Sequence, residues 1–81
     1  MYNVPINQKE EKKMPDKTAV GMRLRAYRKA KGVSRDTAAA EIGISSAALG
    51  MYELGARTPR DEVKMEIASY YGHSVQDIFF A

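Results

Sequence analysis

The sequence SRDTAAAEIGISSAALGMYE, residues 34–53, decides the fold. Ser34 is expected to cap a helix that runs through three alanines and ends at Gly43, a residue suited to the left-handed conformation that terminates helices. Ser45 is expected to cap a second helix over residues 46–54. Because only three residues, beginning with that glycine, separate the two helices, the second must cross the first steeply.

A steep crossing at short range requires small side chains where the two helix axes meet. Ala38, Ala39 and Ala48 supply them. The second helix is then pushed outward as a ridge, which fits the major groove of B-DNA, about 12 Å wide. This arrangement is a helix-turn-helix, in which the N-terminal residues of the second helix lie nearest the base edges.

Glycines also separate helical segments on either side of this motif. Apolar residues at i, i+4 and i+7 predict a helix over residues 18–31, and two more helices are expected over residues 60–71 and after Ser74. No segment shows sustained period-two alternation, so the sequence predicts an all-α five-helix bundle without a sheet. Helical spacing places Met22, Met65 and Tyr71 toward the core and Met51 outward.

The chain has 81 residues and no cysteine, which allows one domain and neither a disulfide nor a thiolate metal site. Residues 1–17 lack apolar periodicity, so we expect a flexible N-terminal leader followed by one domain over residues 18–81. An alternative for the leader is a basic arm whose lysines touch phosphate. There is no apolar run of about 18 residues to span a membrane, and no secretory signal. These features indicate a cytoplasmic protein.

Charge is distributed unevenly along the chain, whose formal net charge is +3. Residues 18–60 carry eight basic and three acidic side chains, whereas residues 61–81 carry one basic and four acidic ones. The first segment would attract a polyanion and the second would avoid it. Charge alone leaves open that these are solvated faces that differ in sign.

Four stretches carry a resemblance to a known family. They are RAYRKAKGVS at residues 25–34, IGIS at 42–45, YELGARTP at 52–59, and the segment from Ile67-Ala68 through Gly72 to Ser74-Val75. In this order and spacing they resemble the lambda repressor and Cro type of helix-turn-helix domain, also called the xenobiotic-response-element type. The resemblance covers residues 20–80. It implies binding to double-stranded DNA by a small transcriptional regulator, in the simplest case a repressor of phage, mobile-element or bacterial type.

The resemblance also implies roles for individual residues. Arg35 stands where the family usually has a glutamine that touches the phosphate backbone. Arg28 and Glu53 match a pair that forms a buried ion pair in many members, so they are expected to be structural. The residues implied to contact DNA are Arg35, Ser45, Ser46, Ala47, Gly50, Met51, Arg57 and Thr58. Those from 45 to 51 are expected on the exposed face of the recognition helix, and the last two in the loop after it.

The expected recognition helix departs from the family pattern. Residues 46–51 offer no long hydrogen-bonding side chain, so base readout would rest on serine hydroxyls, on contacts of Ala47 or Met51 with thymine methyl groups, and on DNA shape. We expect modest base discrimination, a large share of backbone contacts and a preference for A·T-containing sites. The same apolar ridge leaves an alternative open: an adaptor or antirepressor that binds protein and keeps the fold without reading DNA.

The sequence gives little support for catalysis or cofactor binding. Its one histidine, His73, lies across the bundle from the recognition helix, so no serine triad is expected, and with Asp77 alone it makes a weak metal site. There is no glycine-rich phosphate loop. We expect a protein that is not an enzyme, with no cofactor, no metal and no small-molecule effector site.

The C-terminal residues are apolar and favour self-association. Two adjacent phenylalanines are difficult to bury together in one small bundle. We therefore predict a homodimer through the C-terminal helix, with Ile78, Phe79 and Phe80 at the contact and recognition helices about 34 Å apart on a pseudo-palindromic operator. The alternative is a monomer in which Phe80 covers the end of the bundle.

Overall fold

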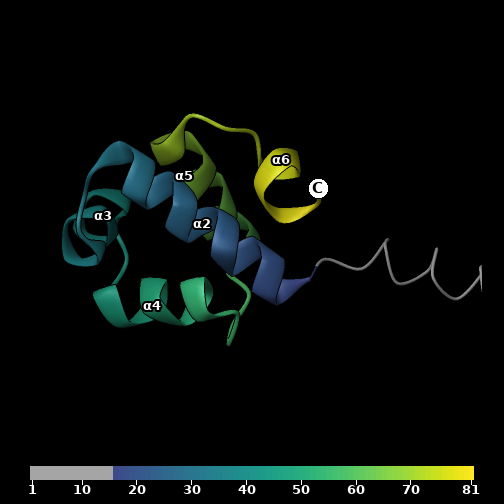
Figure 1. Cartoon of the computed structure of the whole chain (residues 1–81), viewed down its shortest axis with the longest axis horizontal. Helices are drawn as coiled ribbons and strands as arrows, with labels where there is room; N and C mark the ends of the chain where they lie inside the picture. The colour runs from purple at the N-terminus through teal and green to yellow at the C-terminus, as the bar shows by residue number, and fades with distance from the viewer. Residues whose placement is uncertain (1–15) are drawn as a thin grey trace, which may run out of the picture.

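The computed structural model describes residues 16–81, which form five helices and no strand. The elements in chain order are α2 (Lys17–Lys31), α3 (Arg35–Ile42), α4 (Ser46–Leu54), α5 (Asp61–Tyr71) and α6 (Val75–Phe79). Figure 1 shows α2 running through the middle of the bundle, with α3 and α4 on one side and α5 and α6 on the other. The prediction of an all-α five-helix bundle is confirmed. Residues 1–15 of the expected leader lie outside the described residues.

The helices begin and end at the residues that local chemistry selects. Ser34 and Ser45 each accept a hydrogen bond from the backbone N–H three residues later, at 3.1 and 3.0 Å. Gly43 ends α3 with φ of 97°, a conformation that side chains disfavour, and so turns the chain toward α4. Asp16 caps α2, which therefore begins one residue earlier than predicted. The helix-turn-helix spans residues 35–54.

Small side chains allow α3 and α4 to cross closely. Ala38 and Ala39 are buried, and Ala48 packs against the core from α4. Larger apolar residues from all five helices fill the remaining interior, namely Val20, Leu24, Ile42, Leu49, Tyr52, Ile67, Ile78 and Phe79. This single core fixes α4 relative to α2 and α3, and it leaves the outer side of α4 for contact with a partner.

Two predictions about the core are wrong. Met22 and Met65, expected inside, have side chains that are mostly exposed, because Leu24 on α2 and Ile67 on α5 take the inward positions instead. Tyr71 does pack against the core as expected, but it is only partly buried. Its neighbour Tyr70 also packs there and donates a hydrogen bond to the Glu41 carboxylate at 2.5 Å, which joins α5 to α3.

The C-terminal helix is part of the bundle's own core. Ile78 is fully buried and Phe79 is 2% exposed, so the prediction that both lie at a subunit contact is wrong. Nε of Arg23 on α2 donates a hydrogen bond to the Ile78 carbonyl at 2.9 Å, which holds α6 against α2. Phe80 is 46% exposed and is the part of this segment that remains available to a partner. Among residues 16–81, no helix is long and apolar enough to cross a membrane.

Candidate nucleic-acid interface

Helix α4 lies along one edge of the bundle, where no other described helix covers its outer side (Figure 1). Ser45 and Ala47 are exposed at its N-terminal end, and Ser46 is partly buried. Met51, one turn later, is 39% exposed. These positions match the expectation that the N-terminal half of this helix presents its outer face to a partner.

Gly50 differs from that expectation, because it is buried. A Cβ atom at this position would lie 2.8 Å from Nη1 and 3.3 Å from Cζ of Arg35. The side chain of Arg35 therefore covers Gly50 from the neighbouring helix α3. The helical spacing of residues 46–51 alone does not reveal this, because the covering group comes from another element.

The serine hydroxyls at the start of α4 are engaged within the protein. Oγ of Ser46 donates to Oδ1 of Asp36 at 2.5 Å and accepts from Nε of Arg35 at 3.2 Å. Oγ of Ser45 accepts from the backbone N–H of Ala48 as the helix cap. Ser46 thus orients Arg35, whereas the Ser45 hydroxyl keeps its proton for donation to an outside acceptor.

Arg28 and Glu53, the pair expected to be structural, join α2 to α4. Nε of Arg28 donates to Oε2 of Glu53 at 2.7 Å and Nη2 donates to Oε1 at 3.1 Å. Nη1 of Arg28 also reaches the carbonyl oxygen of Val33 at 3.1 Å. The hydrogen bond to Glu53 raises the pKa of Arg28, so the guanidinium stays charged. With side chains only 15% and 7% exposed, this fork-to-fork pair fixes the position of α4.

Tyr71 lies next to this pair. Its hydroxyl is buried and has no hydrogen-bond partner within the described part of the chain. Burial raises its pKa to about 12, with a smaller contribution from the negative charge of Glu53. The phenol therefore stays neutral at physiological pH and acts as a packing group.

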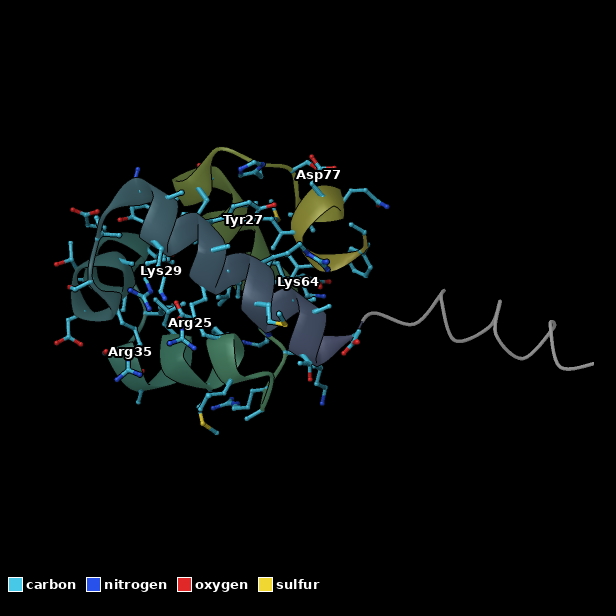
Figure 2. The ribbon with its side chains drawn as sticks, viewed as in Figure 1. Arg25, Tyr27, Lys29, Arg35, Lys64 and Asp77 are labelled. Carbon is cyan, nitrogen blue, oxygen red and sulfur yellow. The ribbon has the colours of Figure 1, made fainter. Side chains whose placement is uncertain are left out.

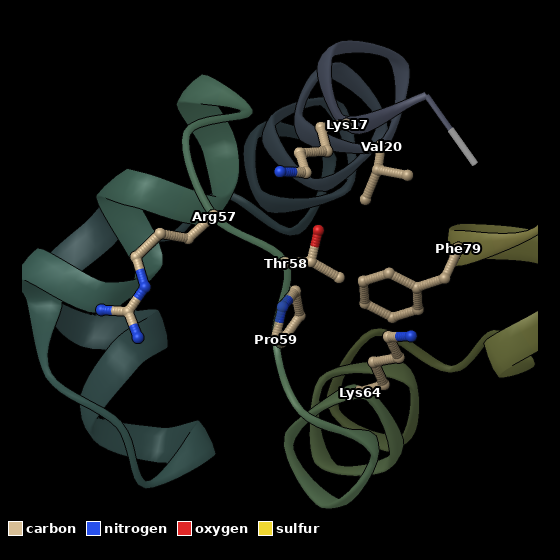
Figure 3. Close-up of a pocket in the computed structure, with 7 residues that line it drawn as sticks. All are labelled: Lys17, Val20, Arg57, Thr58, Pro59, Lys64 and Phe79. Carbon is tan, nitrogen blue, oxygen red and sulfur yellow. The ribbon is translucent and has the colours of Figure 1, made fainter. Parts of the chain in front are cut away.

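Arg57 and Thr58 follow α4 in the loop, and their side chains take different directions (Figure 3). Both residues are exposed. Arg57 points away from a cavity of about 210 Å³, while Thr58 points into it, toward Lys17 of α2. The apolar side chains of Val20, Pro59 and Phe79 also line this cavity, which is partly open, and Lys64 lies across it from Lys17 (Figure 3). Arg57 is thus the member of this pair that is free to meet an anion outside the bundle.

Sequence reasoning missed a second feature beside α4, a cleft of about 190 Å³ that we call the arginine cleft. It is lined by Arg25, Arg28, Arg35, Gly50, Glu53 and Leu54. Figure 2 shows Arg25 reaching from α2 and Arg35 reaching from α3 to the same side of the bundle as α4. The spacing of Arg25, three residues before Arg28 on α2, indicates that both residues face α4.

The remaining candidate chemistry is sparse in residues 16–81. No group of three or more histidine, cysteine, aspartate or glutamate side chains is placed to hold a metal ion in this range. His73 stacks on the ring of Tyr27, with centroids 4.2 Å apart. This contact gives the histidine a packing role at the end of α5.

Comparisons with known proteins identify the same helix-turn-helix arrangement as the structure. The sequence profile of the family described as "Helix-turn-helix domain" matches residues 19–78. Curated protein sequences give no match. Among solved structures, the restriction-modification controller protein C.AhdI from Aeromonas hydrophila is 30% identical, with a TM-score of 0.73 over 79% of this chain and 93% of that chain. The clp gene regulator ClgR from C. glutamicum is 29% identical, with a TM-score of 0.68 over 76% and 80%.

The P22 c2 repressor, solved in complex with a synthetic operator, is 22% identical, with a TM-score of 0.72 over 74% of this chain and 91% of that chain. At this identity the likeness concerns the fold alone. The family match covers most of the described domain, and the helix-turn-helix, the Arg28–Glu53 pair and the exposed α4 agree with it. The chain therefore belongs to the helix-turn-helix domain family, of the lambda repressor and Cro type.

Proposed function

We propose that this protein is a transcription regulator that binds double-stranded DNA, with α4 in the major groove and arginines from the neighbouring elements on the phosphate backbone. The observation that carries the proposal is that α4 lies on the outside of the bundle beside several arginine side chains. Ala47 and Met51 on α4 are exposed and are available to contact the major groove of DNA. Arg35 near the N-terminal end of α4 and Arg57 just after its C-terminal end are exposed, which supports the inference that they contact phosphates on either side. A regulator of this kind acts in the cytoplasm or nucleoid, where the DNA lies.

The engaged serines support modest base discrimination. Because Ser46 is held by Asp36 and Arg35, the exposed groups left for base edges are the Ser45 hydroxyl and the apolar side chains of Ala47 and Met51. Methyl contacts of this kind favour thymine. Binding would therefore rest mainly on backbone contacts and DNA shape, and a specificity ratio well above about 10⁵ over random DNA at 150 mM salt would contradict this part of the proposal.

The test is a salt titration of binding to a random duplex and to the DNA upstream of the gene. The logarithm of affinity should fall linearly with the logarithm of salt concentration, with a slope of about 0.9 per phosphate contact. Arg35→Ala and Arg57→Ala should each reduce the slope by about one contact. Lys31→Ala is the control, because Lys31 sits over the Tyr70 ring at 4.7 Å, away from α4. An adaptor would give no such line, and Met51→Lys would abolish capture of its protein partner instead.

The protein acts on DNA as a homodimer in this proposal, with Phe80 at the subunit contact. Phe80 is 46% exposed, whereas Ile78 and Phe79 just before it lie in the core. Nζ of Lys64 lies over the Phe80 ring, 4.8 Å from its centroid. Sedimentation that shows only monomer at high micromolar concentration would remove the dimer, and Phe80→Glu should dissociate it.

A further inference from the structure

Gly50 holds a particular place in α4, because the absence of its side chain leaves room for Arg35. The Nη1 atom of Arg35 occupies the space next to the position of a missing Cβ atom, 2.8 Å away. The guanidinium is fixed from its other side by Ser46, which accepts from Nε and is itself anchored on Asp36. Arg35 therefore lies along the recognition helix and does not extend freely into solvent.

The arginine cleft next to this contact is suited to an anion. Its lining includes three arginines and one glutamate, a formal charge of +2. Arg28 is paired with Glu53, which leaves Arg25 and Arg35 to attract a ligand. Arg25 makes no salt bridge with a carboxylate in residues 16–81, and Arg35 uses only Nε in its bond to Ser46. The remaining N–H groups of two guanidinium groups match the oxygens of a phosphate.

We propose that Gly50 is a seat for the Arg35 side chain, and that Arg25 and Arg35 together hold one phosphate of the DNA backbone at the mouth of the arginine cleft. This inference rests on the proposed function and adds two residues to it: Arg25 as a direct contact and Gly50 as a positioning residue. A glycine inside a helix is less stable than an alanine, so position 50 carries a cost in stability that the seat explains.

The decisive variant is Gly50→Ala, whose effects on stability and on binding should have opposite signs. The atom that an alanine Cβ would meet is the end of a flexible side chain, so the fold accommodates it and the midpoint of urea unfolding should rise. Displacement of Arg35 should lower the affinity for a duplex about fivefold and reduce the salt slope by about one contact. A purely structural glycine would instead show lower stability and an unchanged slope, which would overturn the inference.

A double-mutant cycle shows whether Gly50 acts through Arg35. If it does, Gly50→Ala has no further effect on affinity in an Arg35→Ala background. An equal loss in both backgrounds would mean that the alanine directly disturbs the contact of α4 with the major groove. The proposal that Gly50 positions Arg35 would then be wrong. Arg25→Ala should reduce the salt slope by about one contact, whereas the control Lys31→Ala leaves it unchanged.

Inorganic phosphate in solution offers the arginine cleft the same oxygen ligands as a phosphate of the DNA backbone. An NMR titration distinguishes these two ligands. Sodium phosphate is compared with sodium chloride at equal ionic strength, with the amide signals of residues 25, 35 and 50 as the readout. If Arg25→Ala abolishes phosphate binding and leaves the DNA affinity unchanged, the cleft is a free-anion site and its assignment to the duplex is wrong. If the wild-type protein binds no duplex at all, the proposed function fails and the inference fails with it. Duplex binding that Arg25→Ala and Gly50→Ala leave unchanged overturns the inference alone.

Discussion

The two ends of α4 are fixed to the bundle in different ways. Toward its C-terminal end the contact joins backbone to backbone: a Cβ atom on Gly21 of α2 would lie 2.8 Å from the carbonyl oxygen of Tyr52 and even closer to that of Glu53. Toward its N-terminal end, Ser46 holds the side chain of Arg35, which is also the group nearest to Gly50 in the middle of the helix. Both glycines are buried and helical. Gly21 allows the backbones of α2 and α4 to approach closely, whereas Gly50 leaves room beside α4 for the side chain of Arg35. We therefore expect changes at the backbone contact to alter stability, and changes at the side-chain contact to alter the proposed DNA binding.

The largest expected effect comes from Gly21→Ala. The added methyl group meets backbone atoms of α4 that cannot rotate away, so α2 and α4 must separate. We expect a loss of about 3 kcal/mol in the free energy of unfolding, at the upper end of typical overpacking costs. Urea denaturation followed by circular dichroism measures it, and Gly50→Ala is the matched control with the same chemical change. The comparison breaks down if the two variants shift stability in the same direction.

Glu53→Gln tests the same C-terminal end of α4 with a smaller effect. The variant keeps the side-chain volume but leaves the Arg28 guanidinium, 15% exposed, without its countercharge. We expect a loss of about 2 kcal/mol in the free energy of unfolding. Asp61→Asn is the control, because Asp61 is 95% exposed and its 3.7 Å contact with Lys64 should contribute less than about 1 kcal/mol. Equal losses in the two variants would show that the pair between α2 and α4 is no stronger than a surface contact.

The smallest effect on stability is expected from Ser46→Ala at the N-terminal end of α4. The network of Ser46 with Arg35 and Asp36 is exposed, so its removal should change the free energy of unfolding by about 0.5 kcal/mol or less. Without the hydroxyl, Arg35 loses its orientation, and the duplex affinity should fall about threefold, less than on removal of the charge itself. Urea denaturation and fluorescence anisotropy on the same samples measure both quantities. A loss of stability as large as that of Glu53→Gln would show that the network of Ser46, Arg35 and Asp36 stabilises the fold, and would contradict its proposed role in DNA binding.

Helix boundaries were predictable because they depend on neighbours in sequence. Ser34 and Ser45 cap the helices that follow them, and Gly43 ends α3, all through contacts within three or four residues. The predicted ranges 35–42 and 46–54 are therefore confirmed. The Arg28–Glu53 contact was also anticipated, because the family resemblance supplied a long-range pairing that periodicity cannot give.

Residues whose environment depends on other helices were harder to place. Met65 lies at helical spacing with Ala68, yet the arrangement of the helices around α5 puts Ala68 in the core and leaves Met65 outside. Gly50 lies on the side of α4 that Arg35 covers, and nothing within residues 46–51 indicates that. Phe79 and Phe80 are adjacent, and their order in the sequence alone does not indicate that Phe79 enters the core while Phe80 stays 46% exposed. Side-chain burial at helix contacts is a property of three-dimensional packing, which one sequence specifies only indirectly.

The hydrogen bond from Arg23 to the Ile78 carbonyl makes α2 a shared support. The same helix carries Arg25 and Arg28 toward α4 two and five positions later, so its register is set jointly by the C-terminal segment and by the recognition helix. Helix α2 is therefore the element that connects α6 with the cationic groups beside α4. If Phe80 forms the proposed dimer contact and α4 binds DNA as proposed, a change in the position of α6 on dimerisation would alter DNA affinity, and DNA binding would alter the dimerisation equilibrium by the same factor.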